Sequence, residues 1–219
     1  MERFRDRQDA GDRLAEAVAA LAPQDPVVLA LPRGGVPVAA PVAARLGAPL
    51  DIVSVRKIGA PGNPEYAVGA LVDGDPPEPV WNEEVLAGLG LSRDDLQETV
   101  ARESRVLAER RDLYLKGRAP VPLEGRDAVV VDDGIATGAT LRAALKGLAA
   151  RRPARVLLAV PVGPPGVEED FAGLADAVVC LVTPRPFHAV GQGYIAFGQT
   201  SDAEVVACLD RNAEGQDGA

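Results

Sequence analysis

The chain has 219 residues, of which 47% are hydrophobic and 25% charged, and its net charge is −9. This balance is typical of a globular protein with a sizeable core, and the negative charge argues against a nucleic-acid-binding surface, which needs basic patches. No window approaches the roughly 18 unbroken apolar residues of a membrane span, and the charged N-terminus lacks an apolar signal region. Cys180 and Cys208 lack metal-ligand spacing and suggest no disulfide framework. We therefore expect a cytoplasmic protein.

Apolar spacing and turn residues predict the elements of the first third of the chain. They are a helix over 9–21, a strand over 27–31, a turn over 32–35, a helix over 36–47, and strands over 51–55 and 67–71. Gly47 is expected to end the second helix, and Pro41 to fit its interior poorly. The Gly/Pro-rich stretch 57–65 is expected to be mobile.

The remainder of the chain continues the alternation of helices and strands. It is predicted to contain turns over 72–81 with a short extended piece at Val80-Trp81, a long helix over 92–115, strands over 128–131, 155–160 and 177–182, and a last helix over 202–210. Alternating elements indicate an α/β fold whose mostly parallel sheet carries helices on both faces. We expect one domain over 1–211, with a core over about 24–182 and a hood formed by about 183–211 and the N-terminal helix. Residues 212–219 are expected to form a disordered tail.

The most informative segment is AVVVDDGIATGAT (128–140), whose apolar run ends in the adjacent carboxylates of Asp132 and Asp133. A loop of small residues and hydroxyls follows, and then a helix. Backbone N–H groups, hydroxyls and a helix N-terminus can hold a phosphate, and glycine lets the backbone approach it closely. The two acids cannot bind phosphate, so they would serve sugar hydroxyls or a metal. A lone Asp-Asp pair would indicate only a helix cap, but the full pattern indicates a site for a phosphorylated sugar.

The spacing D-D-x-x-x-T-G-x-T resembles the signature with which type I phosphoribosyltransferases bind phosphoribosyl pyrophosphate (PRPP). The resemblance implies that Asp132 and Asp133 hold the ribose hydroxyls and contribute to binding Mg²⁺, directly or through water. It assigns the 5′-phosphate to a cradle made of Gly134, Ile135, Ala136, Thr137, Gly138, Ala139 and Thr140. Family members that act on 6-oxopurines have an acidic residue where this chain has Ala136. The resemblance therefore favours an adenine-like base over hypoxanthine or guanine.

Two further segments carry the resemblance. PRGG (32–35) alone indicates a glycine turn, but the family has a pyrophosphate-binding loop here, often with a strained peptide bond, which gives that role to Arg33, Gly34 and Gly35. The segment 55–70 is similar to part of the adenine phosphoribosyltransferases and implies a lid over the pyrophosphate. Lys57 would counter the charge of the pyrophosphate and Arg56 would also contact substrate. Neighbouring strand residues point to opposite faces, so only one of these two cations is expected to face the ligand.

The segment 183–205 is rich in aromatic residues and glycine and contains the only histidine, His188. A base needs a flat apolar face to stack on. In the family this region forms the hood that selects the base, so the resemblance implies that Phe187 or Val190 forms a stacking wall. No role follows for His188.

Together these features predict a Mg²⁺-dependent enzyme that transfers a phosphoribosyl group from PRPP to a small nitrogenous base and releases pyrophosphate, as in nucleotide salvage. The resemblance also implies a homodimer. The alternative is a non-catalytic PRPP-binding sensor on the same fold. A third possibility, an α/β hydrolase, lacks a G-x-S-x-G elbow.

Overall fold

The computed structural model describes residues 3–217, and no helix in that range is both long and apolar enough to traverse a bilayer. The strands form two sheets, a parallel one of five strands and an antiparallel one of three. The parallel sheet has the order β2 (Leu50–Ile52), β1 (Val27–Ala30), β6 (Asp127–Val131), β7 (Arg155–Val162) and β8 (Ala177–Val182). The expected α/β class and the predicted strands at 27–31, 128–131, 155–160 and 177–182 are confirmed.

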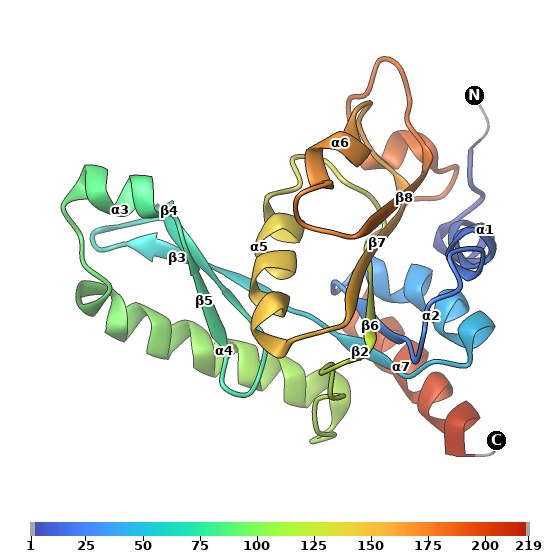
Figure 1. The fold of residues 1–219 in the computed structure, drawn as a ribbon, viewed down its shortest axis with the longest axis horizontal. Coiled ribbons are helices and arrows are strands. Elements are labelled where there is room, and N and C mark those ends of the chain that lie inside the picture. The colour runs from blue at the N-terminus through green and yellow to red at the C-terminus, as the bar shows by residue number, and fades with distance from the viewer. Residues whose placement is uncertain (1–2, 218–219) are drawn as a thin grey trace.

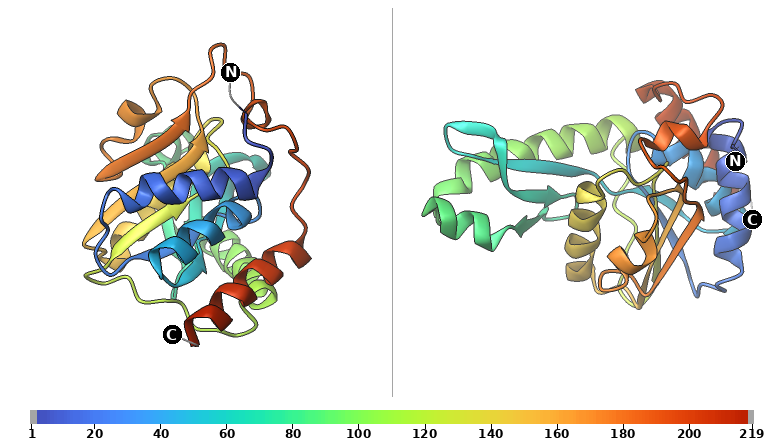
Figure 2. Two further views of the ribbon diagram at one scale, coloured as in Figure 1. Left: turned by 90° about the vertical axis from the view of Figure 1, so that its right-hand side faces the viewer. Right: turned by 90° about the horizontal axis from the view of Figure 1, so that it is seen from above.

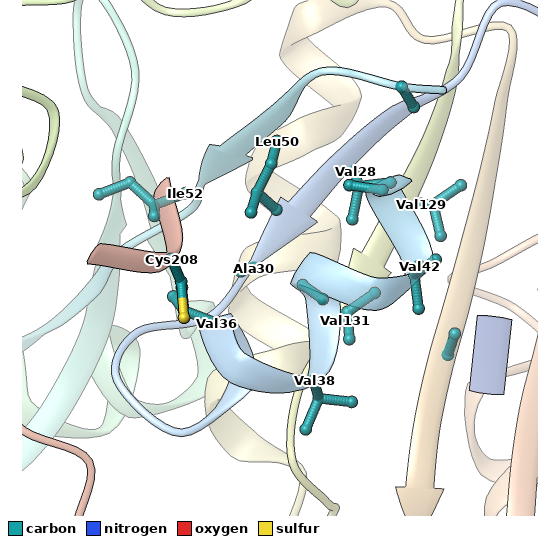
Figure 3. Close-up of a cluster of buried hydrophobic side chains, with 14 of the residues drawn as sticks. Val28, Ala30, Val36, Val38, Val42, Leu50, Ile52, Val129, Val131 and Cys208 are labelled. Atoms are coloured by element: carbon teal, nitrogen blue, oxygen red, sulfur yellow. The ribbon is translucent and has the colours of Figure 1, made fainter. Parts of the chain in front are cut away.

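Helices cover both faces of the parallel sheet because its central strands are apolar on both sides. Side chains of alternate residues, such as Val28 and Val129, pack against α1 (Arg7–Ala19), α2 (Gly35–Leu46) and α7 (Asp202–Asp217). Figure 3 shows this cluster, with Val38 and Val42 of α2 beside the strand residues. The opposite alternation, with Val27 and Val130, packs against α5 (Ala139–Leu148) and α6 (Val167–Phe171).

The second sheet and two helices form an arm that projects from the core (Figure 1). It consists of β3 (Val55–Ala60), β4 (Asn63–Val72) and β5 (Glu78–Trp81), covered by α3 (Glu83–Leu89), a 3₁₀ turn η1 (Asp94–Leu96) and α4 (Gln97–Leu115). The arm has its own apolar cluster, which includes Ile58, Leu71 and Leu107. It is therefore a packed unit.

The sequence-based assignment of this region needs correction. The strand expected over 51–55 is divided between β2 and β3, and the stretch expected as a mobile loop over 57–65 forms most of a β-hairpin. Pro61 and Gly62 supply its turn, and Gly62 has a φ of +75°, which glycine adopts at little cost. The helix α3 was not predicted, although Asn82 caps its first turn and Gly90 ends it in a left-handed conformation.

The predicted helices match the structure more closely than the arm strands do. α2 ends before Gly47, whose φ is +60°, as expected, and it accommodates Pro41. The long helix begins as the 3₁₀ turn, where Asp95 accepts hydrogen bonds from the backbone N–H and the hydroxyl of Ser92. The last helix continues to Asp217, so the expected disordered tail is wrong for 212–217. Its Asn212 accepts a hydrogen bond from the Leu50 N–H, which ties this end to the sheet; residues 218–219 lie outside the described range.

The N-terminal segment meets the loop between β8 and α7 beside the carboxyl ends of β6 and β7. The backbone of Phe4 forms hydrogen bonds with Gly193 and Ile195, and Arg5 accepts one from Ala196. Figure 2 shows the N-terminal segment and the C-terminal loop running side by side. This contact places the N-terminal segment against the region expected to form the hood.

Candidate active site

Asp132 and Asp133 stand directly after β6, at the carboxyl end of the parallel sheet, where ligands bind in such folds. Both are half-buried. One Asp132 carboxylate oxygen accepts a hydrogen bond of 2.8 Å from the Asp133 N–H. The Asp133 Oδ2 instead accepts a hydrogen bond from Arg7 Nε at 2.8 Å and lies 2.7 Å from Arg7 Nη2. The two acids are therefore not equivalent, because, of the two, only Asp133 forms an ion pair within residues 3–217.

The electrostatics of the pair follow from this asymmetry. Burial, and then the negative charge of Asp133, raise the pKa of Asp132 well above its usual range. Burial also raises the pKa of Asp133, while the hydrogen bond and charge of Arg7 oppose that rise. The site thus holds two adjacent carboxylates with one guanidinium. It favours a ligand that brings hydrogen-bond donors or positive charge.

The loop over 32–35 lies against the acidic pair, although about 100 residues separate them in sequence. A Cβ atom on Gly34 would collide with the Asp133 carboxylate, and one on Gly35 would lie 2.8 Å from the Val131 carbonyl oxygen. Only glycine allows this approach. The peptide bond between Pro32 and Arg33 is cis.

The Arg33 side chain points away from the acids, toward α4 and α7. Its Nη1 lies 3.8 Å from Oδ1 of Asp202, which also accepts a 2.7 Å hydrogen bond from the Tyr114 hydroxyl. Arg33 lines a cavity of about 430 Å³ together with Arg110 and Tyr114. The backbone of the loop, and not the Arg33 guanidinium, therefore faces the acidic pair.

The expected phosphate cradle forms the connection between β6 and α5. Ala136, Thr137, Ala139 and Thr140 are exposed, and Gly138 takes a φ of +72° at the helix start. Exposed hydroxyls beside the first, unpaired N–H groups of a helix suit a phosphate. Ile135 differs, because its side chain is buried in the core and its N–H donates to the Val162 carbonyl. Gly134 lies beneath Val190, since a Cβ there would collide with that side chain.

Arg56 and Lys57 point to opposite faces of β3, as expected. Arg56 forms an ion pair with Glu103 of α4 at 2.9 Å, within the arm. Lys57 is exposed, forms a 2.8 Å ion pair with Glu65 of β4, and borders a cavity that also contains Thr140 of α5. Of these two cations, Lys57 is therefore the one that faces the cradle.

The hood residues pack as a small cluster above the acids. Phe187 and Val190 contact a buried group that includes Phe4, Val162 and Tyr194. Tyr194 donates a 2.6 Å hydrogen bond from its hydroxyl to the Asp133 carbonyl. The half-buried Phe187 is thus part of this packing, and Val190 lies nearest the loop at Gly134.

Sequence reasoning missed Arg7, which also donates to the Gly198 carbonyl at 2.7 Å and places its guanidinium 4.1 Å from the centre of the Phe197 ring. Phe197 stacks on Tyr194 at 4.8 Å and is itself 39% exposed. Arg7 belongs to a run of alternating charges with no distinguishing local pattern. Nothing in its own neighbourhood predicts a partner at position 133.

The acidic pair can be tested as a Mg²⁺ site by its chemistry. Among the described residues there is no group of three or more acids, histidines or cysteines that could cage a metal. Mg²⁺ is commonly held by one or two carboxylates together with substrate oxygens. Asp132, which forms no ion pair in the part of the chain that the structure describes, fits this donor set, whereas Arg7 already engages one oxygen of Asp133.

A family model described as phosphoribosyl transferase domain matches residues 6–182 of this chain. Two Mycobacterium tuberculosis proteins, from strains CDC 1551 / Oshkosh and ATCC 25618 / H37Rv, are provisionally named phosphoribosyl transferases. Each is 50% identical to the chain over 211 residues. The matches cover 96% of the chain and 47% of each relative, so the chain spans about half the length of these relatives.

The crystal structure of TT1426 from Thermus thermophilus is also similar. It has 47% sequence identity and a TM-score of 0.82, and the match covers 94% of this chain and 97% of that chain. The arm and the core are therefore shared with a solved structure over nearly the whole length.

Proposed function

This chain belongs to the phosphoribosyl transferase family, and we propose that it transfers a phosphoribosyl group from PRPP to a small nitrogenous base with release of pyrophosphate, in a Mg²⁺-dependent reaction. The observation that carries the proposal is the meeting of the two loops. Gly34 and Gly35 lie against Asp133 and Asp132, beside the exposed hydroxyls of the cradle. That arrangement offers separate places for a sugar, a phosphate and a leaving group.

Each part of the site has a role in this proposal. Asp132 accepts hydrogen bonds from the ribose hydroxyls, and Asp133 assists from its position beside Arg7. Thr137, Thr140 and the N-terminus of α5 hold the 5′-phosphate. The backbone of the 32–35 loop receives the pyrophosphate, with Lys57 contributing positive charge when the arm approaches. Bound Mg²⁺ would neutralise charge on the departing pyrophosphate.

The reaction needs little covalent participation from the protein. As pyrophosphate departs, the anomeric carbon gains positive charge, and the nearby carboxylates stabilise it while the loops hold the sugar in line with the base. Gly34 and Gly35 cover one side of the acids and leave the other side open to the substrate. We place the base beneath the hood, near Val190 and the exposed face of Phe197, and favour an adenine-like base because Ala136 is not acidic. The proposal includes a cytoplasmic homodimer that acts in nucleotide salvage.

The second candidate is a PRPP-binding sensor without catalysis. It is favoured by one observation, that the protein's own side chains engage several groups expected to meet substrate. Arg7 holds Asp133, Glu103 holds Arg56, and Asp202 lies beside Arg33. A sensor would bind PRPP and never release pyrophosphate.

Pyrophosphate release from PRPP and Mg²⁺ against a panel of purine, pyrimidine and pyridine bases distinguishes the two. We expect base-dependent release, and we expect the double variant Asp132→Asn, Asp133→Asn to lower turnover by on the order of 100-fold, since catalysis depends on holding the sugar. Circular dichroism checks that the variant is folded. If PRPP stabilises the protein thermally but no base causes pyrophosphate release, the result would support the sensor. Unchanged kinetics in the double variant would overturn the assignment of the acids.

A further inference from the structure

A cavity of about 660 Å³ separates the arm from α5, outside the acidic pair and the 32–35 loop. One side comes from the arm, through Val55, Ala70, Val80 and Trp81, and the facing side is the part of α5 from Ala139 to Lys146. In Figure 1, α5 stands between the arm and the parallel sheet, so this cavity is on the arm side of the helix. Its size is that of a small-molecule site.

The arm side of the cavity presents an aromatic surface. Trp81, the only tryptophan of the chain, is half-buried and packs on the apolar cluster of the arm while it lines the cavity. A Cβ atom on Gly69, the β4 residue that pairs with Trp81, would lie 3.1 Å from the indole Cε3. The glycine therefore lets the indole lie against the strand and leaves room in front of it. Such a surface suits a planar ring.

The helix side presents positive charge. Arg142 and Lys146 stand one turn apart on α5, so they share a face. The Arg142 guanidinium lies 4.4 Å from the centre of the Phe171 ring, donates to the Asp170 carbonyl at 2.7 Å and lies 3.9 Å from the Asp170 carboxylate. These contacts draw it toward α6, so Arg142 borders the cavity and would exchange an exposed ion pair to meet a ligand there. Lys146 is exposed and forms no ion pair or side-chain hydrogen bond within residues 3–217. Lys57 adds a third cation, whose exposed pair with Glu65 costs little to exchange.

This concentration of cations stands out in a chain whose net charge is −9. The carboxylates at the cavity are Glu83 and Glu84, next to Asn82 at the start of α3, and Arg93 already pairs with Glu83. One end of the cavity therefore suits an anionic group and the other suits hydrogen-bond donors. A molecule with a phosphate at one end and an amino-bearing aromatic ring at the other complements both ends.

From these features we infer that the cavity between Trp81 and α5 is a binding site for a nucleoside 5′-monophosphate, with the ring against Trp81 and the phosphate on Arg142 and Lys146. The site shares only Lys57, Ala139 and Thr140 with the proposed PRPP site. It does not contain Asp132, Asp133 or the 32–35 loop. Binding there would bridge the arm and the core.

The single tryptophan makes a direct test possible, since its fluorescence reports on this cavity without any turnover. Titration of the full chain with adenosine 5′-monophosphate should quench Trp81 in a saturable way. Ribose 5-phosphate, which has the sugar and the phosphate but no aromatic base, should give no saturable quenching. Lys146→Gln should weaken the binding of adenosine 5′-monophosphate about tenfold, as expected for a lost charge-assisted contact.

Two controls separate this site from the rest of the protein. Lys116→Gln, at the end of α4 and remote from the cavity, should leave the affinity unchanged. In the double variant Asp132→Asn, Asp133→Asn, adenosine 5′-monophosphate should still quench the Trp81 fluorescence, whether or not the variant retains transferase activity. Three results would each overturn the inference. They are no saturable quenching of Trp81, equal weakening of nucleotide binding by Lys146→Gln and Lys116→Gln, and loss of quenching in the double aspartate variant. The last result would mean that the nucleotide occupies the proposed PRPP site.

Discussion

The guanidinium of Arg7 and the carboxylate of Asp133 form an ion pair between residues 126 positions apart in the chain, with N–O distances of 2.7 and 2.8 Å. Both side chains are largely buried, at 14% and 16% exposure. The pair connects the first helix to the acidic end of β6. It also connects the acidic end of β6 to the hood, because Arg7 donates to the Gly198 carbonyl and packs on Phe197.

Arg7→Gln should lower the free energy of unfolding by about 2 kcal/mol, because the substitution leaves the largely buried Asp133 carboxylate without its partner. It should also weaken PRPP binding, since the carboxylate loses the contact that fixes its direction. Urea unfolding and isothermal titration measure the two effects. Arg45→Gln is the matched control, because its pair with Glu16 is exposed and should change stability by less than about 1 kcal/mol. Equal effects of the two variants would contradict a special role for Arg7.

Gly34→Ala should abolish most transferase activity while the protein still folds. The new methyl group would collide with the Asp133 carboxylate, so the 32–35 loop and the acidic pair must separate. We expect a loss on the order of 100-fold in kcat/KM for PRPP, as for a small displacement of reacting groups. Gly88→Ala is the control, because nothing lies within 4 Å of a Cβ there and alanine favours its helix. Full activity of Gly34→Ala would show that the two loops need not touch.

Asp132→Asn should stabilise the protein at neutral pH and have little effect in acid. Burial, and then the charge of Asp133, hold the pKa of Asp132 above its unfolded value, which is about 3.9. Below that unfolded pKa the residue is protonated in both states, and as the pH rises through the folded pKa the cost of the buried charge grows. The stability gain from asparagine should therefore increase between about pH 3 and pH 7, as followed by urea unfolding.

Asp12→Asn provides the comparison for that experiment, because Asp12 is exposed on α1. It should change stability by no more than about 0.5 kcal/mol at either pH. A gain for Asp132→Asn that is independent of pH would show that the buried charge is not its origin.

Arg111→Met should destabilise the protein by about 3 kcal/mol or more, the usual cost of stranding a buried charge partner. Arg111 of α4 donates to Asp51 of β2 and to Asp73 just after β4, at 2.8 to 3.1 Å, and both carboxylates are almost fully buried. The three residues join the arm to the parallel sheet. Urea unfolding measures the loss, and Arg93→Met, which breaks an exposed pair with Glu83, should cost less than about 1 kcal/mol. A small effect at Arg111 would mean that packing alone holds the arm.

Several parts of the fold could be predicted because their signals are local. The apolar runs at β1, β6, β7 and β8, the glycine after α2 and the pattern over 128–140 are each complete within a short window. The arm was harder to predict, because β3 and β4 read equally well as strands of the parallel sheet. The turn at Pro61-Gly62 that pairs them is a local signal, but the packing of α3 and α4 on the hairpin depends on contacts that no single window contains.

The candidate site divides in the same way. The sequence by itself determined that two carboxylates precede a small-residue loop and a helix, since adjacent residues and backbone preferences specify that order. Only the tertiary structure decided that Arg7 partners Asp133, that Arg33 turns toward Asp202, and that Lys57 and not Arg56 faces α5. The direction of these side chains depends on contacts with residues far away in the sequence, and those contacts form only when the chain folds.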